Sequence, residues 1–337
     1  MRIAVDAMGG DKGPKVVVPG AIDAILARKG EARLILVGRE DEIRPLVGGV
    51  DPQLVEVVNA TETIDMHESP ATAIRRKKDA SITVALRLVR EGKADAMVSA
   101  GNTGAVVASS LLTIGRLHGV SRPAISTLWP NKRSGAVVLD VGANHECTPK
   151  NLVQFAIMGS VFAEHHLGIE RPRVGLLNIG EERSKGNELV RDSYALLEAD
   201  NRINFVGNVE GRDVFDGAAD VVVCDGFVGN VILKFSESIY SFLAHLVRDE
   251  IRRGLLAKAG ALLMTPAFKS IRSQLDYAEY GGAPLLGVKG VVIISHGKSS
   301  RRAIANAVLA AAKSVNLGIN GHIEDRFARS VEHAGIS

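Results

Sequence analysis

The stretch Met1-Arg2-Ile3-Ala4-Val5-Asp6-Ala7-Met8-Gly9-Gly10-Asp11 joins a short apolar run to a polar turn that contains two glycines. Residues 3–5 have the length and the valine and isoleucine content of a buried strand. Gly9 and Gly10 let the turn close tightly and bring backbone N–H groups near an anion. A strand that ends in such a turn is typical of α/β proteins, which bind ligands beyond the carboxyl ends of their strands.

The same unit recurs along the chain. Further strand-like runs, several of them apolar on both faces, cover residues 33–37, 54–58, 96–99, 136–140, 174–178, 203–206, 221–224 and 291–295. Helix-like segments between strands cover residues 14–29, 81–91, 149–166 and 299–315. This alternation predicts a doubly wound, three-layer α/β/α sandwich. Since no linker rich in Gly, Ser or Pro divides residues 1–337, we expect one domain in which two lobes exchange strands.

The composition is that of an ordinary globular protein, with 46% hydrophobic and 23% charged residues. A formal net charge of +3 and an aromatic content of 4% argue against a nucleic-acid partner. Cys147 and Cys224, the two cysteines, are far apart in sequence, which argues against a disulfide framework and a zinc site. We read no secretory signal before the first strand and no run of roughly 18 apolar residues, so we expect a cytoplasmic protein.

Six predicted strands end in loops rich in Gly, Asn and Asp, and a helix follows several of them. Such loops, with the positive end of a following helix dipole, bind anions. One loop is weak evidence because every strand end needs a turn, but six at one edge of a sheet indicate a polar, phosphate-sized site. These loops cover residues 6–11, 99–104, 140–144, 178–182, 224–230 and 295–300.

Motifs for several other chemistries are incomplete. Gly297-Lys298-Ser299 resembles the end of a P-loop, but Val292 stands where the first glycine is required. No G-x-G-x-x-G follows the first strand, and neither Ser99 nor Ser295 lies in a G-x-S-x-G elbow. Most histidines lack ligand spacing and read as structural or surface residues, so we predict no metal site. His296 differs because it lies in a glycine loop at a strand end.

Residues 254–271, with the sequence GLLAKAGALLMTPAFKSI, break the alternation of strands and helices. Lys258 and Lys269 are the only charged residues in this segment, and Pro266 predicts a division into two short helices. An amphipathic element of this kind lies in a membrane interface, against a partner subunit or on the core of its own chain.

Basic residues near the loops are candidates to balance the charge of a bound phosphate, although each also reads as a solvated surface charge. The candidates are Lys185, Lys234 and Lys298. The run Arg75-Arg76-Lys77-Lys78 reads as a helix face in water or as a docking patch for an acidic protein.

Together the loops resemble the phosphate acyltransferases that use acyl-acyl carrier protein and phosphate. The matching stretches, in order, are VDAMGGD (5–11), SAGNTGA (99–105), DVGAN (140–144), LLNIGEE (176–182), GNVEG (207–211), CDGFVGNV (224–231), YGGAPLLG (280–287) and SHGKSS (295–300). The resemblance implies an isocitrate or isopropylmalate dehydrogenase-like fold, a homodimer, no cofactor, and conversion of acyl-acyl carrier protein and phosphate to acyl phosphate. It also implies peripheral membrane association, where a membrane glycerol-3-phosphate acyltransferase takes up the product, and identifies residues 254–271 as the membrane-contacting tip.

A thioester is already activated and phosphate is a competent nucleophile, so this reaction needs no covalent enzyme intermediate. We expect the enzyme to hold both reactants in attack geometry and to stabilise the oxyanion. The predicted catalytic residues are His296, as proton donor to the leaving thiolate, with Lys185 and Lys234. The predicted phosphate- and substrate-binding residues are Gly9, Gly10, Gly101, Asn102, Thr103, Gly104, Asn144, Asn178, Gly226, Gly229, Asn230 and Lys298. Asp6, Asp140 and Asp225 are expected to order the loops, because carboxylates facing phosphate would repel it.

Three alternative functions remain open at this stage. A soluble phosphate acetyltransferase that uses acetyl-coenzyme A would not need the apolar segment 254–271. A dehydrogenase of the same fold would need a cluster of aspartates for a metal-bound hydroxy acid, which we do not find. A non-catalytic scaffold that recruits acyl carrier protein would not need six glycine-rich strand ends.

Overall fold

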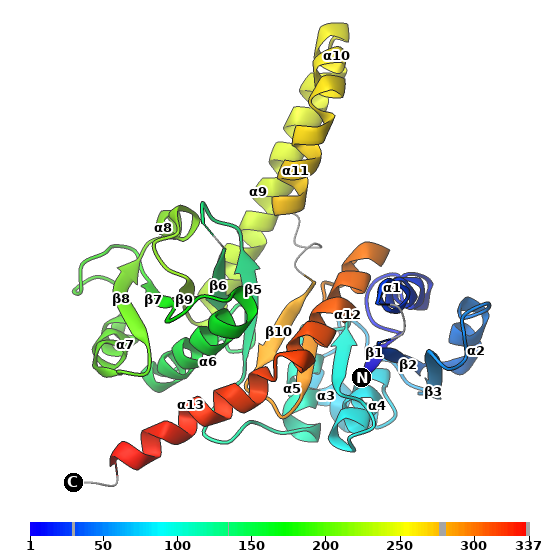
Figure 1. The fold of residues 1–337 in the computed structure, drawn as a ribbon, viewed down its shortest axis with the longest axis horizontal. Helices are drawn as coiled ribbons and strands as arrows, with labels where there is room; N and C mark the ends of the chain where they lie inside the picture. The colour runs from blue at the N-terminus through cyan, green and yellow to red at the C-terminus, as the bar shows by residue number, and fades with distance from the viewer. Residues whose placement is uncertain (29–30, 134, 276–280, 335–337) are drawn as a thin grey trace.

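One eleven-stranded sheet runs through the protein, in the order β3-β2-β1-β4-β11-β10-β5-β6-β9-β7-β8. The structure is a computed structural model that describes residues 1–337 except 29–30, 134, 276–280 and 335–337 (Figure 1). The strands are β1 Arg2–Asp6, β2 Arg33–Gly38, β3 Val55–Asn59, β4 Ala96–Ser99, β5 Ala124–Trp129, β6 Ala136–Leu139, β7 Arg173–Leu177, β8 Asn204–Val209, β9 Val221–Val223, β10 Ala283–Leu286 and β11 Val291–Ile294.

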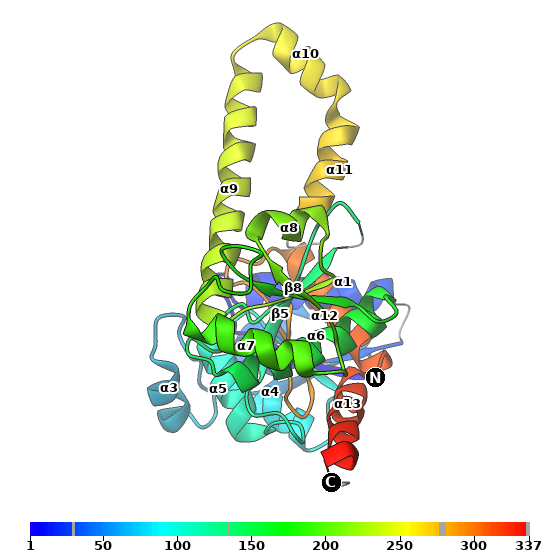
Figure 2. The same ribbon diagram turned by 90° about the vertical axis from the view of Figure 1, so that its left-hand side faces the viewer.

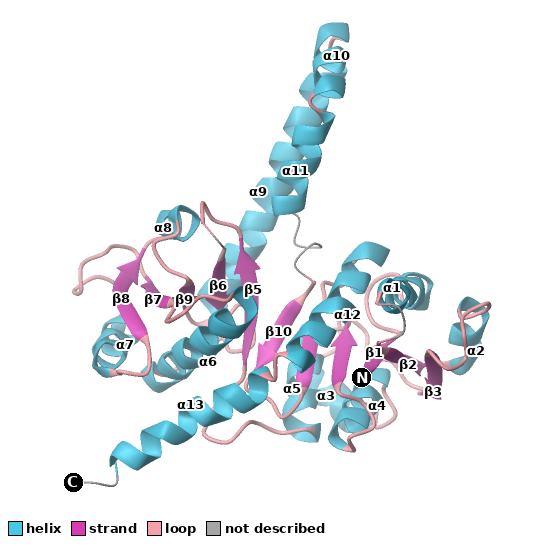
Figure 3. Cartoon of the chain, viewed as in Figure 1, coloured by secondary structure: helices cyan, strands magenta, loops and turns pink. Residues whose placement is uncertain are grey.

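Helices pack against both faces of this sheet (Figure 3). The helices of the described residues are α1 Pro14–Ala27, α2 Glu40–Ile43, α3 Pro70–Arg76, α4 Ser81–Arg90, α5 Thr103–Thr113, α6 Pro149–Leu167, α7 Glu188–Ala199, α8 Gly211–Asp216, α9 Gly226–Arg252, α10 Leu255–Leu263, α11 Thr265–Leu275, α12 Arg301–Asn316 and α13 Ile319–Ala334, with a 3₁₀ turn at Arg44–Leu46. The mixed α/β fold with a large central sheet that the sequence predicts is therefore confirmed.

The sheet consists of two parallel halves that run in opposite directions. Strands β3, β2, β1, β4 and β11 are parallel to one another, as are β6, β9, β7 and β8. Between them, β10 is antiparallel to β11 and to β5, and β5 is antiparallel to β6. The prediction that six glycine loops share one edge is therefore wrong, since three loops follow strands of each half.

Buried aliphatic side chains hold the layers together. In the first half, α1 and α12 pack on one face of the sheet and α4 and α5 on the other. In the second half, α6 and α13 cover one face, where Phe155 and Phe162 of α6 are almost fully buried. Burial of side chains of this size contributes about 2–3 kcal/mol each, which holds α6 against the sheet.

Helices α9, α10 and α11 extend away from the body of the protein, with α10 at the far end (Figures 1 and 2). The segment 254–271 forms α10 and the first part of α11, and Pro266 is the second residue of α11, where its missing N–H costs no helical bond. The predicted division into two helices is thus confirmed. Leu255 is 84% exposed and Leu256 is 91% exposed. Within the described residues, no helix is both long enough and apolar enough to cross a membrane.

Candidate functional site

Hydrogen bonds tie together three loops at the carboxyl ends of β1, β4 and β11. The Ser99 hydroxyl donates to Asp6 Oδ2 at 2.6 Å and accepts from the Gly101 N–H at 3.0 Å. The Ser295 N–H donates to the Ser99 carbonyl at 2.8 Å. Burial raises the pKa of Asp6, and the Ser99 hydroxyl lowers it in part. Asp6 therefore orders the loops, as predicted. The three loops, which we name the first loop group, cover residues 6–11, 99–104 and 295–300.

Two glycines allow these loops to approach one another closely. A Cβ on Gly9 would lie 2.7 Å from the Gly101 nitrogen, closer than real Cβ contacts come. Gly10 has a φ of +82°, and a Cβ there would lie 2.9 Å from the Gly297 carbonyl oxygen. That carbonyl accepts the Asp11 N–H at 2.8 Å. The predicted residues Gly9, Gly10 and Gly101 are thus brought together.

Helix α5 begins at Thr103, at the end of the β4 loop of the first loop group. Asn102 caps the helix, because its Oδ1 accepts the Ala105 N–H at 3.1 Å. Its amide donates to the carbonyls of Met66 at 3.0 Å and Glu68 at 3.2 Å, so the side chain is occupied in holding another segment of the chain. Thr103 and Gly104 are exposed. Within the described residues no acceptor pairs with their N–H groups, which leaves two donors at the positive end of a helix dipole.

His296 and Lys298 lie in the loop next to α5. The Lys298 N–H donates to His296 Nδ1 at 3.0 Å. Because Nδ1 is an acceptor in this bond, the neutral ring carries its proton on Nε2. The hydroxyls of Ser295 and Ser299, both buried, lie 2.8 Å apart and fix the base of the loop. Sequence reasoning found His296 but missed these two serines, which have no distinctive spacing.

Asp140, at the end of β6, is the centre of a second set of loops. Its Oδ1 accepts N–H groups of Ile125, Gly142 and Ala143 at 3.0–3.1 Å. Its Oδ2 accepts the N–H and the amide of Asn144 at 2.7 and 2.9 Å. Burial raises the pKa of Asp140, and these hydrogen bonds lower it in part. As predicted, Asp140 orders its loop. Asn144 is a structural partner of Asp140, and it also donates to the Pro123 carbonyl at 2.7 Å.

The start of α9 packs directly on this loop. A Cβ on Gly229 would lie 1.9 Å from the Asp140 carbonyl oxygen, and one on Gly226 would lie 2.5 Å from the Asn144 carbonyl oxygen. The Gly226 N–H donates to Asn144 O, and the Gly229 N–H donates to Asp225 O. Asp225 Oδ1 accepts the next two N–H groups of the helix, at 2.9 and 3.0 Å. Backbone donors 226–229, which the sequence suggested for phosphate, are therefore all occupied.

The remaining candidates follow strands of the second half of the sheet. They are Asn178, Lys185, Asn230 and Lys234. Asn230 lies beside Gly142, and within the described residues its amide has no hydrogen bond. Asn178 donates to the carbonyl of Lys185 at 3.2 Å and accepts the Ile179 N–H, so it shapes its own loop. The ammonium groups of Lys185 and Lys234 are exposed and have no ion pair in the part of the chain described. We name the loops of this half, residues 140–144, 178–185 and 224–230, the second loop group.

Two strands separate the two loop groups. Ile294 of β11 pairs with Ala283 of β10, and Leu285 of β10 pairs with Ile125 of β5, whose N–H binds Asp140. Three interstrand spacings therefore lie between β11 and β6, about 14 Å across the sheet. Lys298 and His296 lie with the open end of α5, whereas Lys185 and Lys234 do not.

Comparison with known proteins identifies the family. A family model described as "Fatty acid synthesis protein" matches residues 1–321. The phosphate acyltransferase of Heliobacterium modesticaldum is 54% identical over 336 residues, covering 98% of this chain and 99% of that protein. The chain belongs to the phosphate acyltransferase family. The phosphate acyltransferase of Halothermothrix orenii is 48% identical over 335 residues, covering 98% of this chain and all of that protein. The chain is therefore an acyltransferase and not a non-catalytic scaffold.

The fold also has a solved counterpart. A phosphotransacetylase from Streptococcus pyogenes superposes with a TM-score of 0.64 at 19% identity, covering 94% of each chain. At this identity the likeness establishes a shared fold. This chain and that phosphotransacetylase therefore have the same arrangement of helices around a mixed central sheet.

Neither cysteine of this phosphate acyltransferase family member is suited to act as a nucleophile. Burial raises the pKa of Cys147 to about 11, and burial also raises the pKa of Cys224. Both thiols therefore stay protonated at neutral pH, and a thiol is a far weaker nucleophile than a thiolate. In the described part of the chain, no group of three or more His, Cys, Asp or Glu side chains could hold a metal ion.

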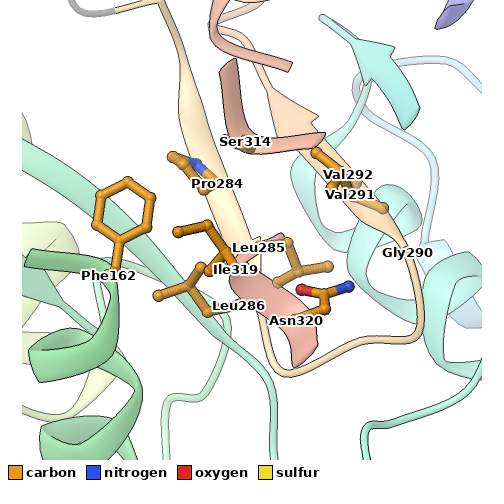
Figure 4. Close-up of a pocket in the computed structure, with 10 residues that line it drawn as sticks. All are labelled: Phe162, Pro284, Leu285, Leu286, Gly290, Val291, Val292, Ser314, Ile319 and Asn320. Carbon is orange, nitrogen blue, oxygen red and sulfur yellow. The ribbon is translucent and has the colours of Figure 1, made fainter. Parts of the chain in front are cut away.

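A small cavity lies between α6, β10, the start of β11 and α13 (Figure 4). It measures about 10 Å³ and is bounded by Phe162, Leu285 and Leu286, together with residues at the start of β11 and in α13. The Ser295 loop follows the opposite end of β11. This volume holds about one water molecule, so the cavity is a packing defect and not an acyl pocket.

Proposed function

We propose that this enzyme transfers a long-chain fatty acyl group from acyl-acyl carrier protein to inorganic phosphate, and that the acyl phosphate feeds phosphatidic acid synthesis. The observation that carries the proposal is the open N-terminus of α5, set among the loops of β1, β4 and β11. Its free Thr103 and Gly104 N–H groups, with Lys298 in the adjacent loop, suit a phosphate anion. The names of near-full-length relatives support the same reaction.

In this proposal the bound phosphate attacks the thioester carbonyl directly. A phosphate oxygen forms the new C–O bond, the tetrahedral oxyanion collapses, and the C–S bond breaks. The departing thiolate accepts a hydrogen bond from His296 Nε2–H, and the proton that completes the free thiol is the one that the attacking hydrogenphosphate carried. Asn230, whose amide has no partner in the described part of the chain, lies in the second loop group about 14 Å across the sheet, so it is a candidate for binding the acyl donor away from the reacting carbonyl. Because both cysteines remain thiols, neither is a candidate for carrying the acyl group as an acyl-enzyme.

We assign different roles to the remaining predicted residues. Gly9, Gly10 and Gly101 allow the close approach of the first loop group, and Asn102 positions α5. Asn144, Asn178, Gly226 and Gly229 shape the second loop group. Lys185 and Lys234 are secondary candidates for balancing phosphate charge, because they follow strands of the other half of the sheet.

We further propose an isocitrate or isopropylmalate dehydrogenase-like homodimer in which residues 1–337 form one domain of two interwoven lobes. The return of β10, β11 and α12 to the first half, after β5 to β9, supports the interweaving. An exposed apolar stripe on α9 supports the dimer: Phe235 is 65% exposed and Phe242 is 60% exposed, with Ile239 and Leu246 at helical spacing. Phe235→Glu with Phe242→Glu should give a monomer by light scattering, and an unchanged mass would contradict this interface.

The protruding helices α10 and α11 support peripheral attachment to a membrane, where a membrane glycerol-3-phosphate acyltransferase would accept the product in the cytoplasm. The leucines of α10 are almost fully exposed, and Arg252 and Arg253 precede them. Apolar side chains flanked by basic residues suit the interface of an anionic bilayer. Leu255→Ser with Leu256→Ser should abolish flotation with phosphatidylglycerol vesicles while leaving acyl phosphate formation in solution unchanged.

A steady-state assay tests the proposed reaction. Free carrier protein released from palmitoyl-acyl carrier protein should depend on phosphate concentration, and acetyl-coenzyme A should be a poor substrate. The fold shared with a phosphotransacetylase favours a second candidate, a soluble enzyme that forms acetyl phosphate. Turnover of acetyl-coenzyme A without turnover of the long-chain substrate would establish that second candidate and refute the first.

A further inference from the structure

Residues 61–80, between β3 and α4, form an excursion whose two ends are pinned together. Asp79 Oδ2 accepts the N–H and the hydroxyl of Thr61 at 2.8 and 2.7 Å. The Asp79 N–H donates to Glu62 Oε2 at 2.9 Å, and the Ser81 N–H donates to Glu62 O at 3.0 Å. The excursion thus leaves the body and returns to it at one closed neck. It carries α3, whose last turn contains two arginines.

The inner side of the excursion lies against the loops that we propose bind phosphate. Asn102 donates to the carbonyls of Met66 and Glu68, and a Cβ on Gly104 would lie 2.8 Å from Pro70 Cγ. A Cβ on Gly297 would lie 2.7 Å from Met66 Cε. The excursion therefore borders the open end of α5 and the His296 loop together.

The outer side of the excursion presents unpaired positive charge. Arg75, Arg76 and Lys78 are exposed, and in the described part of the chain none of their charged groups makes an ion pair or hydrogen bond. Lys77 differs, because it binds Glu68 and the Thr63 carbonyl and is half-buried. The acidic groups Glu62 and Asp79 are occupied at the neck. The last turn of α3 and the residues after it therefore form a net basic surface.

We propose that Arg75, Arg76 and Lys78, which we name the α3 basic patch, dock the acidic carrier protein that delivers the acyl thioester. The inference rests on the proposed function. Arg75 lies about 8 Å along α3 from Pro70, which touches the α5 N-terminus, so a carrier docked here has its prosthetic arm beside the phosphate loop. Complementary charges on two protein surfaces speed their association and set their relative orientation, so the α3 basic patch would favour an acidic carrier protein.

A membrane is the other occupant that a basic patch could suit. Figures 1 and 2 place α3 on the body of the protein, at the end away from α10. If the apolar leucines of α10 enter a bilayer, the α3 basic patch faces away from it and toward the surrounding solution. A protein that diffuses in solution therefore fits this position better than lipid does.

Charge reversal at the patch tests the proposal. Arg75→Glu with Arg76→Glu should lower kcat/KM for palmitoyl-acyl carrier protein about tenfold or more, and the remaining activity should become insensitive to ionic strength. The kcat/KM for palmitoyl-coenzyme A and the KM for phosphate should stay within twofold of wild type. The matched control is Arg90→Glu with Lys289→Glu. Arg90 is the exposed last residue of α4, and Lys289 is exposed in the turn between β10 and β11. The control should leave both kcat/KM values and the KM for phosphate unchanged.

Three results would overturn the inference. Carrier kinetics equal to those of the control would remove the α3 basic patch from docking. An equal loss with both thioesters would mean that the substitutions damage the catalytic loops. A loss of binding to phosphatidylglycerol vesicles with normal carrier kinetics would assign the patch to lipid. Failure of the wild-type enzyme to use palmitoyl-acyl carrier protein, with acetyl phosphate formed instead, would refute the proposed function itself.

Discussion

The contact between α9 and the loop after β6 makes Gly229→Ala a stringent test of the second loop group. The new Cβ would lie 1.9 Å from the Asp140 carbonyl oxygen and 3.0 Å from Val141 Cα. Both neighbours are backbone atoms, so no side-chain rotation relieves the clash. Real Cβ atoms essentially never come closer than 3.0 Å to such a neighbour. Because the new contact would measure 1.9 Å, α9 must move away from the loop by about 1 Å.

The magnitude follows from two opposed effects. Overpacking against backbone costs about 3 kcal/mol, the upper part of the range for such insertions. Replacing glycine by alanine inside a helix returns about 1 kcal/mol of helix propensity. We therefore expect a net loss of about 2 kcal/mol in the free energy of unfolding. A displacement of about 1 Å in a catalytic loop lowers kcat/KM by up to about 100-fold.

Urea unfolding and acyl phosphate formation measure these two effects. The matched control is Gly260→Ala in α10, where no atom lies within 4 Å of the new Cβ. The control should be stabilised by up to about 1 kcal/mol with wild-type kinetics in solution. A Gly229→Ala enzyme with wild-type stability and with kcat/KM within twofold of wild type would refute the claim that this contact sets the position of α9.

Three further predictions concern the loops and the core. Asp140→Asn should lower unfolding free energy by about 3 kcal/mol because two Asn144 donors then face an amide NH₂, and an unchanged urea midpoint would contradict this. Burial lowers the pKa of His166 from 6.5 to about 4. The neutral ring therefore costs the folded state nothing above pH 6.5, and the free energy of unfolding falls as the pH drops from 6.5 toward 4. Between pH 7 and pH 5, the unfolding free energy measured with urea should therefore decrease by about 1 kcal/mol less in His166→Asn than in the wild type, and equal decreases in the two proteins would refute this. Lys298→Ala should raise the KM for phosphate about tenfold and Lys234→Ala less than twofold, and the reverse order would move the phosphate to the second loop group.

Much of the sheet could be predicted from the sequence, because its strands are short, apolar and buried on both faces. Residues 96–99 agree in full with β4, and the other predicted strands agree within a few residues. Strands β5 and β10 were missed. Ser126 and Thr127 interrupt the apolar run of β5, and Pro284 weakens the strand pattern of β10. These two antiparallel strands reverse the second half of the sheet, so missing them led to the wrong expectation of one shared loop edge.

The site could be predicted less well than the fold. Gly, Asn and Asp at strand ends marked loops that hydrogen bonds hold in place, and Asp6 and Asp140 order these loops as expected. Residue type alone does not reveal which backbone donors are already paired. Both glycine-containing helix starts, residues 226–229 and residues 103–104, look like anion sites in the sequence. In the structure, Asp225 and Asn144 accept the N–H groups of 226–229, while those of Thr103 and Gly104 have no acceptor among the described residues. The excursion at residues 61–80 approaches these loops only through tertiary contacts, so no local pattern shows it.

The most direct test of the central claim is a single-turnover reaction with ³²P-labelled phosphate and palmitoyl-acyl carrier protein, followed by intact-mass analysis of the enzyme. We predict that ³²P-labelled palmitoyl phosphate forms in step with release of free carrier protein and that the enzyme keeps its unmodified mass at every time point. A palmitoylated enzyme that forms without phosphate and later yields the product would contradict direct attack by phosphate.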